Sequence, residues 1–297
     1  MSDIARLTLS NGVEMPALGL GVYRSSPEET TQAVSKALAV GYRLIDTAAA
    51  YGNEVQVGEA LRRSEIARDD VFVTTKLWIS DYGYDLALHG FERSMRKLGL
   101  NRLDLYLLHQ PMPKEWERTV ASWKAVARLF EEGRTRAIGV SNMNSEQLTT
   151  LIDRTGVVPH VNQVELHPFF TQVELRKTHA RLGIATQAWS PIGGVMRYFK
   201  DSSDLASSPL SHPAVAGLAE KHGKTPAQIV LRWHLQHGIG AIPKSVHAQR
   251  IIENYDVFGF TLGADEIAAI DTLDTGARSG PNPDDIDTTK YPLRIED

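Results

Sequence analysis

The chain has 297 residues, of which 42% are hydrophobic and 23% charged, the balance of a globular protein with a large buried core. Its formal net charge is −4, so the composition offers no basic footprint for nucleic acid. The absence of cysteine excludes disulfides, thiolate nucleophiles and cysteine metal sites. The start resembles no signal peptide, and no apolar run has the length of a membrane span. We therefore expect a cytoplasmic protein that does not bind membranes.

The predicted elements alternate between short apolar runs and amphipathic stretches. Residues 7–15, with Asn11-Gly12 at the turn, predict an opening hairpin. Helical periodicity marks stretches such as 27–41, 86–100 and 116–133. Strand-like runs lie at 17–22, 42–46, 71–76, 103–109, 136–141, 160–165, 184–189 and 239–244. Eight βα units in this length predict an α/β fold, a closed (β/α)8 TIM barrel, and the absence of a linker or repeat predicts one domain over 1–297.

Four polar residues follow separate strand-like runs in the first part of the chain. Asp46 ends RLID and Tyr51 comes after it, Lys76 follows VFVTT and His109 follows LDLYLL. Barrel enzymes place their active sites at the carboxyl ends of the strands, so we expect these side chains to meet. A tyrosine can donate a proton if a neighbouring ammonium lowers its pKa, while a carboxylate keeps that ammonium charged. The histidine can then bond the oxygen that receives the proton.

Each of the four residues alone also has a structural interpretation. Asp46 could cap the following segment with Lys76 as a simple ion-pair partner, His109 could be a satisfied core histidine, and Tyr51 an ordinary rim residue. The four together favour catalysis, because they supply every role that such a site needs.

The letters around these residues resemble those of the aldo-keto reductase family. The shared motifs are RLIDTAAAYGNE (43–54), VFVTTKLW (71–78), LDLYLLHQP (103–111), GVSN (139–142), NQVELHP (162–168) and IPKS (242–245). The likeness is greatest to small bacterial members that reduce diketo-sugar acids. It implies reduction of aldehydes and ketones by direct hydride transfer from NADPH, with Tyr51 as general acid, Lys76 and Asp46 tuning it, and His109 orienting the carbonyl. It also implies a monomer that needs no protein partner and no metal.

The resemblance also implies where the nicotinamide cofactor lies. The chain has no complete G-x-G-x-x-G, since Gly19-Leu20-Gly21 lacks the third glycine, so a doubly wound dinucleotide domain is not expected. The nicotinamide would be bonded by Ser141, Asn142 and Gln163 and stacked on Trp189, where the family more often has tyrosine. Lys244, Ser245 and Arg250 match positions that hold the adenosine 2′-phosphate, and Glu253 and Asn254 those at the adenine. His247 between them is expected to be an exposed histidine at a helix start.

Two irregular segments and four side chains are expected to shape the substrate pocket. Residues 190–211 are too long for a simple βα turn and predict a flap over the cofactor, while the polar tail from about 275 is expected to cover part of the pocket. The side chains that would contact the small-molecule carbonyl are Tyr23, Trp78, His109 and Gln110. Gln110 departs from the tryptophan that is common after this histidine. His167 could suggest a metal site with His109, but a structural role is favoured because no spaced third ligand follows.

Two other functions remain open on the sequence. A cofactor-sensing regulatory module could use the same fold, and measurable turnover would separate it from an enzyme. A barrel isomerase or hydrolase could use His109 and Asp46 as acid and base, but it would leave the cluster at 244–254 without a purpose, and NADPH titration would decide.

Overall fold

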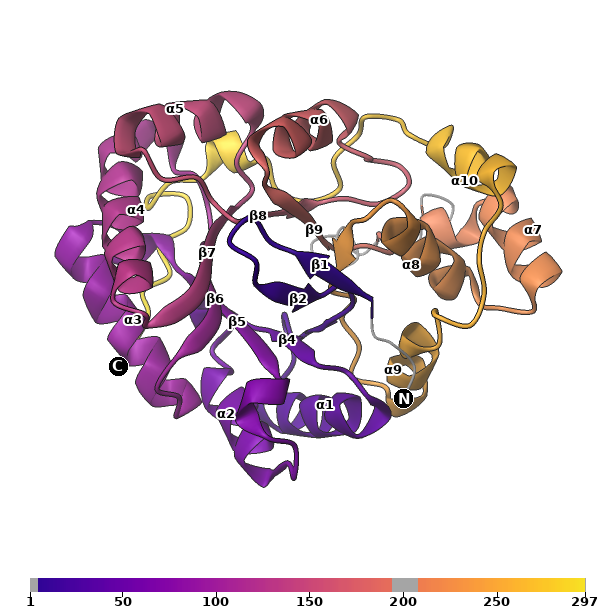
Figure 1. Cartoon of the computed structure of the whole chain (residues 1–297), viewed down its shortest axis with the longest axis horizontal. Helices are drawn as coiled ribbons and strands as arrows, with labels where there is room; N and C mark the ends of the chain where they lie inside the picture. Colours follow the sequence, from indigo (N-terminus) through magenta and orange to yellow (C-terminus); the bar gives the residue numbers. More distant parts are fainter. Residues whose placement is uncertain (1–4, 194–207, 297) are drawn as a thin grey trace.

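The computed structural model describes residues 5–193 and 208–296. Eight parallel strands form one sheet, with each strand beside the next along the chain (Figure 1). They are β3 (Leu20–Gly21), β4 (Leu44–Asp46), β5 (Phe72–Leu77), β6 (Leu103–Leu108), β7 (Thr135–Ser141), β8 (Val161–Glu165), β9 (Ala185–Trp189) and β10 (Gly240–Ala241). All eight predicted strands are present, although the first and last are shorter than expected.

Backbone hydrogen bonds between the first and last strands close the sheet. Gly19 N–H donates to the Ala241 carbonyl (2.9 Å), Ala241 N–H to the Ala17 carbonyl (2.7 Å), and Gly21 N–H to the Pro243 carbonyl (3.1 Å). Because no strand edge is left open at this seam, the sheet is a barrel. The predicted (β/α)8 architecture is confirmed.

Helices surround the barrel, as Figure 1 shows. The first begins with a capping box between Ser26 and Glu29, has Pro27 in its first turn, and ends at Gly41, whose φ of 127° suits a glycine. The helices are α1 (Pro27–Val40), α2 (Glu54–Arg63), α3 (Tyr84–Leu98), α4 (Trp116–Glu131), α5 (Ser145–Thr155), α6 (Val173–Leu182), α7 (Pro213–His222), α8 (Pro226–Gln236), α9 (Ala248–Tyr255) and α10 (Ala264–Asp271). The helices expected at 27–41, 86–100 and 116–133 correspond to α1, α3 and α4.

The opening hairpin lies across one end of the barrel (Figure 1). Its strands β1 (Arg6–Thr8) and β2 (Glu14–Pro16) pair antiparallel, and Gly12 adopts a φ of 81° in the turn. Met15 and Leu9 point into a buried cluster with the inward-facing side chains of the barrel. The hairpin thus seals the end opposite to the carboxyl ends of the strands.

Alternation along the strands decides which polar residues reach the mouth of the barrel. In a strand, successive side chains point to opposite faces, so residues two apart share the inward face. Apolar residues occupy the inward positions in the barrel interior, and polar ones follow at the carboxyl ends of the same strands. Such inward sets are Leu44 with Asp46, Phe72 with Lys76, Leu107 with His109, and Val161 with Gln163.

Gly139 in β7 provides a test of the packing inside the barrel. A Cβ at this position would lie 2.4 Å from the Val161 carbonyl oxygen and 2.7 Å from Leu107 Cδ2. We expect Gly139→Ala to lower the free energy of unfolding by about 1–3 kcal/mol, the usual cost of overpacking. Gly217, exposed in α7 with no neighbour within 4 Å, is the control. Gly217→Ala should instead stabilise by about 0.5–1 kcal/mol, and denaturant unfolding of both variants checks the opposite signs.

Candidate active site

The four predicted catalytic residues meet at the carboxyl ends of β4, β5 and β6. Lys76 is completely buried, and its ammonium donates to Asp46 Oδ1 (2.5 Å), the Thr47 carbonyl (2.9 Å) and Tyr51 Oη (3.4 Å). Burial raises the pKa of Asp46 and lowers the pKa of Lys76, and each charge opposes the shift of the other. Three acceptors around Nζ match the three protons of an ammonium, so we describe the pair as ionised.

Tyr51 keeps its phenolic proton at neutral pH. Burial raises its pKa well above the ordinary value, and the nearby Asp46 and Tyr23 raise it further. Burial therefore dominates the resting pKa of Tyr51, and the lowering expected from the Lys76 ammonium stays a prediction for the proton transfer itself. Since the ammonium donates to Oη, the hydroxyl proton is left to point into the cavity.

His109 lies edge-on between two aromatic rings. Its ring centroid is 5.6 Å from that of Tyr51 and 5.1 Å from that of Trp78. Burial and the charge of Lys76 hold the pKa of His109 well below its ordinary value, so the imidazole is neutral. Its buried Nδ1 has no hydrogen-bond partner among the described residues. A neutral imidazole carries one N–H, which it can donate to an oxygen in the cavity.

Asp46, Tyr51 and His109 border a cavity of about 490 Å³ at the mouth of the barrel. Its wall contains all four expected substrate contacts, Tyr23, Trp78, His109 and Gln110. It also contains five of the expected cofactor contacts, namely Ser141, Asn142, Gln163, Trp189 and Lys244. Ser245, Arg250, Glu253 and Asn254 are not in this wall and lie farther along the chain, in β10–α9 and its approach.

Gln163 is oriented by a chain of hydrogen bonds inside the barrel. Its Nε2 donates to Asp46 Oδ2 (2.8 Å) and to Gln187 Oε1 (2.7 Å), while the Ser141 hydroxyl donates to the Gln163 carbonyl (2.7 Å). Because a carboxylate only accepts, the Gln163 amide must turn its nitrogen inward. Its Oε1 is then the group available to a ligand such as the NH₂ of a carboxamide.

Asn142 is the centre of a second polar cluster. It has a φ of 65°, a left-handed conformation that asparagine tolerates. Trp189 Nε1 donates to its Oδ1 (2.8 Å), and its Nδ2 lies 3.2 Å from both the His109 carbonyl and Gln110 Oε1. The amides of Asn142 and Gln163, together with the Trp189 ring, give the cavity the donors, acceptors and flat surface that fit a nicotinamide.

The segment leading into α9 collects the expected phosphate contacts. Lys244 is half-buried, and burial lowers its pKa while the nearby Glu29 raises it. Ser245 Oγ accepts the backbone N–H of His247 (3.1 Å), the exposed residue that precedes α9, as expected for this histidine. Arg250 is exposed in the first turn of α9, so cations, a hydroxyl and a helix N-terminus occupy one short segment. That chemistry fits a phosphate.

Glu253 and Asn254, the expected adenine contacts, have different surroundings. Glu253 is half-buried and accepts from Gln249 one turn earlier (3.1 Å), whereas Asn254 is 6% exposed. The expected flap falls mostly on residues 194–207, which lie outside the described part of the chain.

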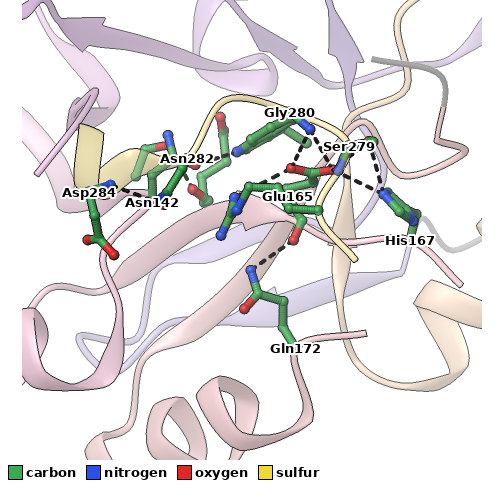
Figure 2. A network of polar contacts seen from close by, with 12 residues as sticks. Asn142, Glu165, His167, Gln172, Ser279, Gly280, Asn282 and Asp284 are labelled. Atoms are coloured by element: carbon green, nitrogen blue, oxygen red, sulfur yellow. Dashed lines mark hydrogen bonds and ion pairs between the residues drawn. The ribbon is translucent and has the colours of Figure 1, made fainter. Parts of the chain in front are cut away.

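The C-terminal tail is held over the site by Glu165, a residue that the sequence analysis did not single out. Both backbone N–H groups of Ser279 and Gly280, and the Ser279 hydroxyl, donate to its carboxylate at 2.6–3.1 Å (Figure 2). Arg278 and His167 add contacts at 3.4 and 3.1 Å. Burial raises the pKa of Glu165, but these hydrogen bonds outweigh it and the net pKa lies below the ordinary value.

From this anchor the tail supplies one wall of the cavity. A Cβ on Gly280 would meet Trp189 Cη2 at 2.6 Å, so the tail passes directly against the indole. Farther on, Trp78 Nε1 donates to the Leu293 carbonyl (3.0 Å). The tail residues in the wall are Pro281, Ile286, Lys290, Tyr291, Pro292 and Leu293. The tail therefore covers part of the pocket, as expected, although the sequence did not identify these residues.

The described residues contain no cluster of three or more His, Asp or Glu side chains that could hold a metal ion. His167 bonds Glu165 and the Ser279 hydroxyl, which gives it the structural role that was favoured. Within the same residues, no helix is long and apolar enough to cross a membrane.

The chain resembles known proteins over almost its entire length. Residues 15–275 match the Aldo/keto reductase family. Morphine 6-dehydrogenase of Pseudomonas putida is 51% identical over 286 residues, 96% of this chain and 96% of that protein. Glyoxal reductase of Bacillus subtilis is 43% identical and covers 94% of this chain and 96% of that protein. A crystal structure of a Gox0644 mutant in complex with NADPH has a TM-score of 0.88 at 43% identity, covering 96% of this chain and all (100%) of that one.

Glu165→Gln tests the anchoring of the tail. An amide cannot accept all the bonds that the carboxylate takes, so we expect a loss of about 1–3 kcal/mol in unfolding free energy at neutral pH. Because the folded-state pKa is lowered, the carboxylate stabilises above the unfolded pKa of about 4.3, and this contribution disappears as pH falls through the folded pKa. The difference between wild type and variant should therefore shrink in acid.

The control is Glu174→Gln, in an exposed pair with Lys177, which should change the unfolding free energy by less than about 0.5 kcal/mol. Denaturant unfolding from pH 7 to about pH 3 makes the measurement. A difference that stays constant over this range would show that the Glu165 charge does not hold the tail.

Proposed function

This chain belongs to the aldo/keto reductase family and is an NADP-dependent oxidoreductase; from that premise we propose that Tyr51 is the proton donor in the reduction of an aldehyde or ketone to an alcohol. When bound, NADPH supplies the hydride. The observation that carries the assignment is the use of all three ammonium protons of Lys76, one of them on Tyr51 Oη. That bond leaves the phenolic proton facing the cavity, where a carbonyl oxygen would sit.

Each neighbour has a distinct part in this proposal. Neutral His109 donates its single N–H to the carbonyl oxygen and so orients it toward Tyr51. As negative charge grows on that oxygen, Tyr51 releases its proton, and the Lys76 ammonium stabilises the phenolate that forms. Asp46 keeps Lys76 charged and in place. The acidity of Tyr51 is thus raised at the moment of transfer, although its resting pKa is high.

The cofactor contacts expected from the sequence are proposed on the same basis. Ser141, Asn142 and Gln163 would hold the carboxamide, and Trp189 would pack on the ring. Lys244, Ser245 and Arg250 would hold the 2′-phosphate, with Glu253 and Asn254 near the adenine. The support is the position of the first four in the cavity and of the last five in one segment leading into and through α9.

The rival reaction, acid–base catalysis by Asp46 and His109, has little support. Both oxygens of Asp46 accept strong hydrogen bonds, from Lys76 and from Gln163, so neither is free to take a substrate proton. The regulatory alternative is tested by turnover, through NADPH consumption across aldehydes, diketones, keto-sugars and keto esters. Relatives named as glyoxal reductase and morphine 6-dehydrogenase suggest that such a panel should be broad. The monomeric state and cytoplasmic location stay predictions.

Tyr51→Phe tests the proton donor. We expect kcat to fall by about a hundredfold to ten-thousandfold, while the Kd for NADPH barely changes, because the hydroxyl acts on the substrate oxygen only. Steady-state kinetics and a fluorescence titration make the two measurements. Tyr84→Phe, at an exposed ring in α3, is the control for loss of a hydroxyl. A Tyr51→Phe enzyme with more than about a tenth of wild-type kcat would exclude Tyr51 as the acid.

Arg250→Ala tests the phosphate site. Loss of one charged contact to a phosphate should weaken NADPH binding by roughly tenfold to a hundredfold and leave NADH, which lacks the 2′-phosphate, unchanged. Arg63→Ala, at an exposed arginine of α2, controls for the change in net charge. Equal losses for the two cofactors in binding titrations would assign Arg250 a structural role.

A further inference from the structure

The direction of the hydrogen bonds around Asn142 is determined by Trp189. An indole N–H can only donate, and Trp189 Nε1 lies 2.8 Å from Asn142 Oδ1. The amide oxygen of Asn142 must therefore face Trp189. Its Nδ2 faces the other way, where it lies 3.2 Å from the His109 carbonyl, a group that can only accept. Two groups with a single hydrogen-bonding role thus agree on the orientation of this amide.

The orientation of Asn142 in turn determines that of a neighbouring amide side chain, Gln110. Asn142 Nδ2 also lies 3.1 Å from Ser141 Oγ and 3.2 Å from the end of the Gln110 side chain. An amide nitrogen of Gln110 at that distance would place two donors against each other, whereas its oxygen accepts. Gln110 must therefore present its Oε1 to Asn142. The main chain of Gln110 is fixed as well, because the Tyr82 hydroxyl donates to its carbonyl (2.6 Å) and accepts its N–H (3.2 Å).

The side-chain nitrogen of Gln110, Nε2, is therefore available to a ligand. Gln110 lines the same cavity as Tyr51 and His109, and among the described residues no acceptor lies within hydrogen-bond distance of its Nε2. Apolar side chains, among them Trp78, Ile286 and Leu293, form much of the wall of the same cavity. One unpaired donor in such a wall discriminates between ligands that can accept its hydrogen bond and ligands that cannot.

We propose that Gln110 is a specificity-determining residue of the reductase, and that Trp189 fixes its polarity through Asn142. The class favoured is a carbonyl compound with an acceptor oxygen close to the reacting carbon, such as a keto ester, a diketone or a keto acid. Plain ketones of the same shape are disfavoured, because they leave Nε2 without a partner. The inference rests on the proposed function and adds to it the polarity of the substrate.

Lys290 is a charged donor that also belongs to the cavity wall. Its Nζ lies 3.6 Å from Asp285 Oδ2, and its side chain is 55% exposed. A solvated, paired ammonium selects neutral acceptors weakly. For that reason a neutral ester isolates the role of Gln110 better than a keto acid does.

The test compares ethyl pyruvate with butyl methyl ketone, two ketones of equal length that differ in the two ester oxygens. The measured quantity is the ratio of their kcat/KM values, which cancels their intrinsic reactivities when variants are compared. Gln110→Met should lower the ratio by about tenfold, the effect of one lost hydrogen bond. Gln110→Glu keeps an acceptor for Asn142 but opposes the ester oxygen with a carboxylate at about pH 8, so its ratio should fall further.

Trp189→Phe keeps an aromatic ring and removes the donor that orients Asn142, so the ratio should fall in this variant too. Gln32→Glu, at an exposed position of α1, controls for the added charge and should leave the ratio unchanged. Ratios within about twofold of wild type in both Gln110 variants would overturn the proposal, and an unchanged ratio in Trp189→Phe alone would overturn the part assigned to Trp189.

Failure of the proposed function would look different. In that case the wild type would consume no NADPH with either ketone or with any compound of the panel. Circular dichroism and thermal melting of the two Gln110 variants separate a lost hydrogen bond from a misfolded chain, and the methionine variant remains informative if the glutamate variant does not fold.

Discussion

The buried ion pair between Lys76 and Asp46 is the interaction on which the rest of the site depends. Two charges removed from water are costly unless each finds good partners, and loss of one partner from such a pair typically costs about 3–5 kcal/mol. Here the ammonium has three acceptors, and the second oxygen of Asp46 takes a bond from Gln163. The same contacts that make the charges tolerable also position Tyr51 and Gln163 at the cavity. Stability and function therefore share one set of bonds.

Much of this arrangement could be predicted from the sequence because it follows from strand geometry. Inward positions recur every two residues, and a polar side chain just after an apolar run lies at the mouth of a barrel. That rule finds Asp46, Lys76 and His109 without knowledge of any contact. Applied one residue pair further, it would also have found Glu165, two positions after Gln163, and Gln187, two before Trp189.

Other features depend on residues far apart in the chain, and no local pattern encodes them. The pKa of Tyr51 is one, because burial raises it and the nearby Asp46 and Tyr23 raise it further. The path of the tail is another, since Glu165 meets Ser279 and Gly280 more than a hundred positions away. The two-residue strands β3 and β10 are a third, because the bonds that join them form only when the barrel closes.

The polarity of the cavity follows from the few groups that have only one hydrogen-bonding role. Asp46 can only accept, so Gln163 turns its nitrogen inward and offers an oxygen to the cavity. Trp189 can only donate, so Asn142 and then Gln110 are turned, and Gln110 offers a nitrogen. An amide side chain can both donate and accept hydrogen bonds, so its orientation is open when it is considered alone. In this barrel each amide is oriented by a neighbour that can only donate or only accept. A tryptophan at 189 matters for this reason, because the hydroxyl of a tyrosine can either donate or accept and would leave the direction of Asn142 open.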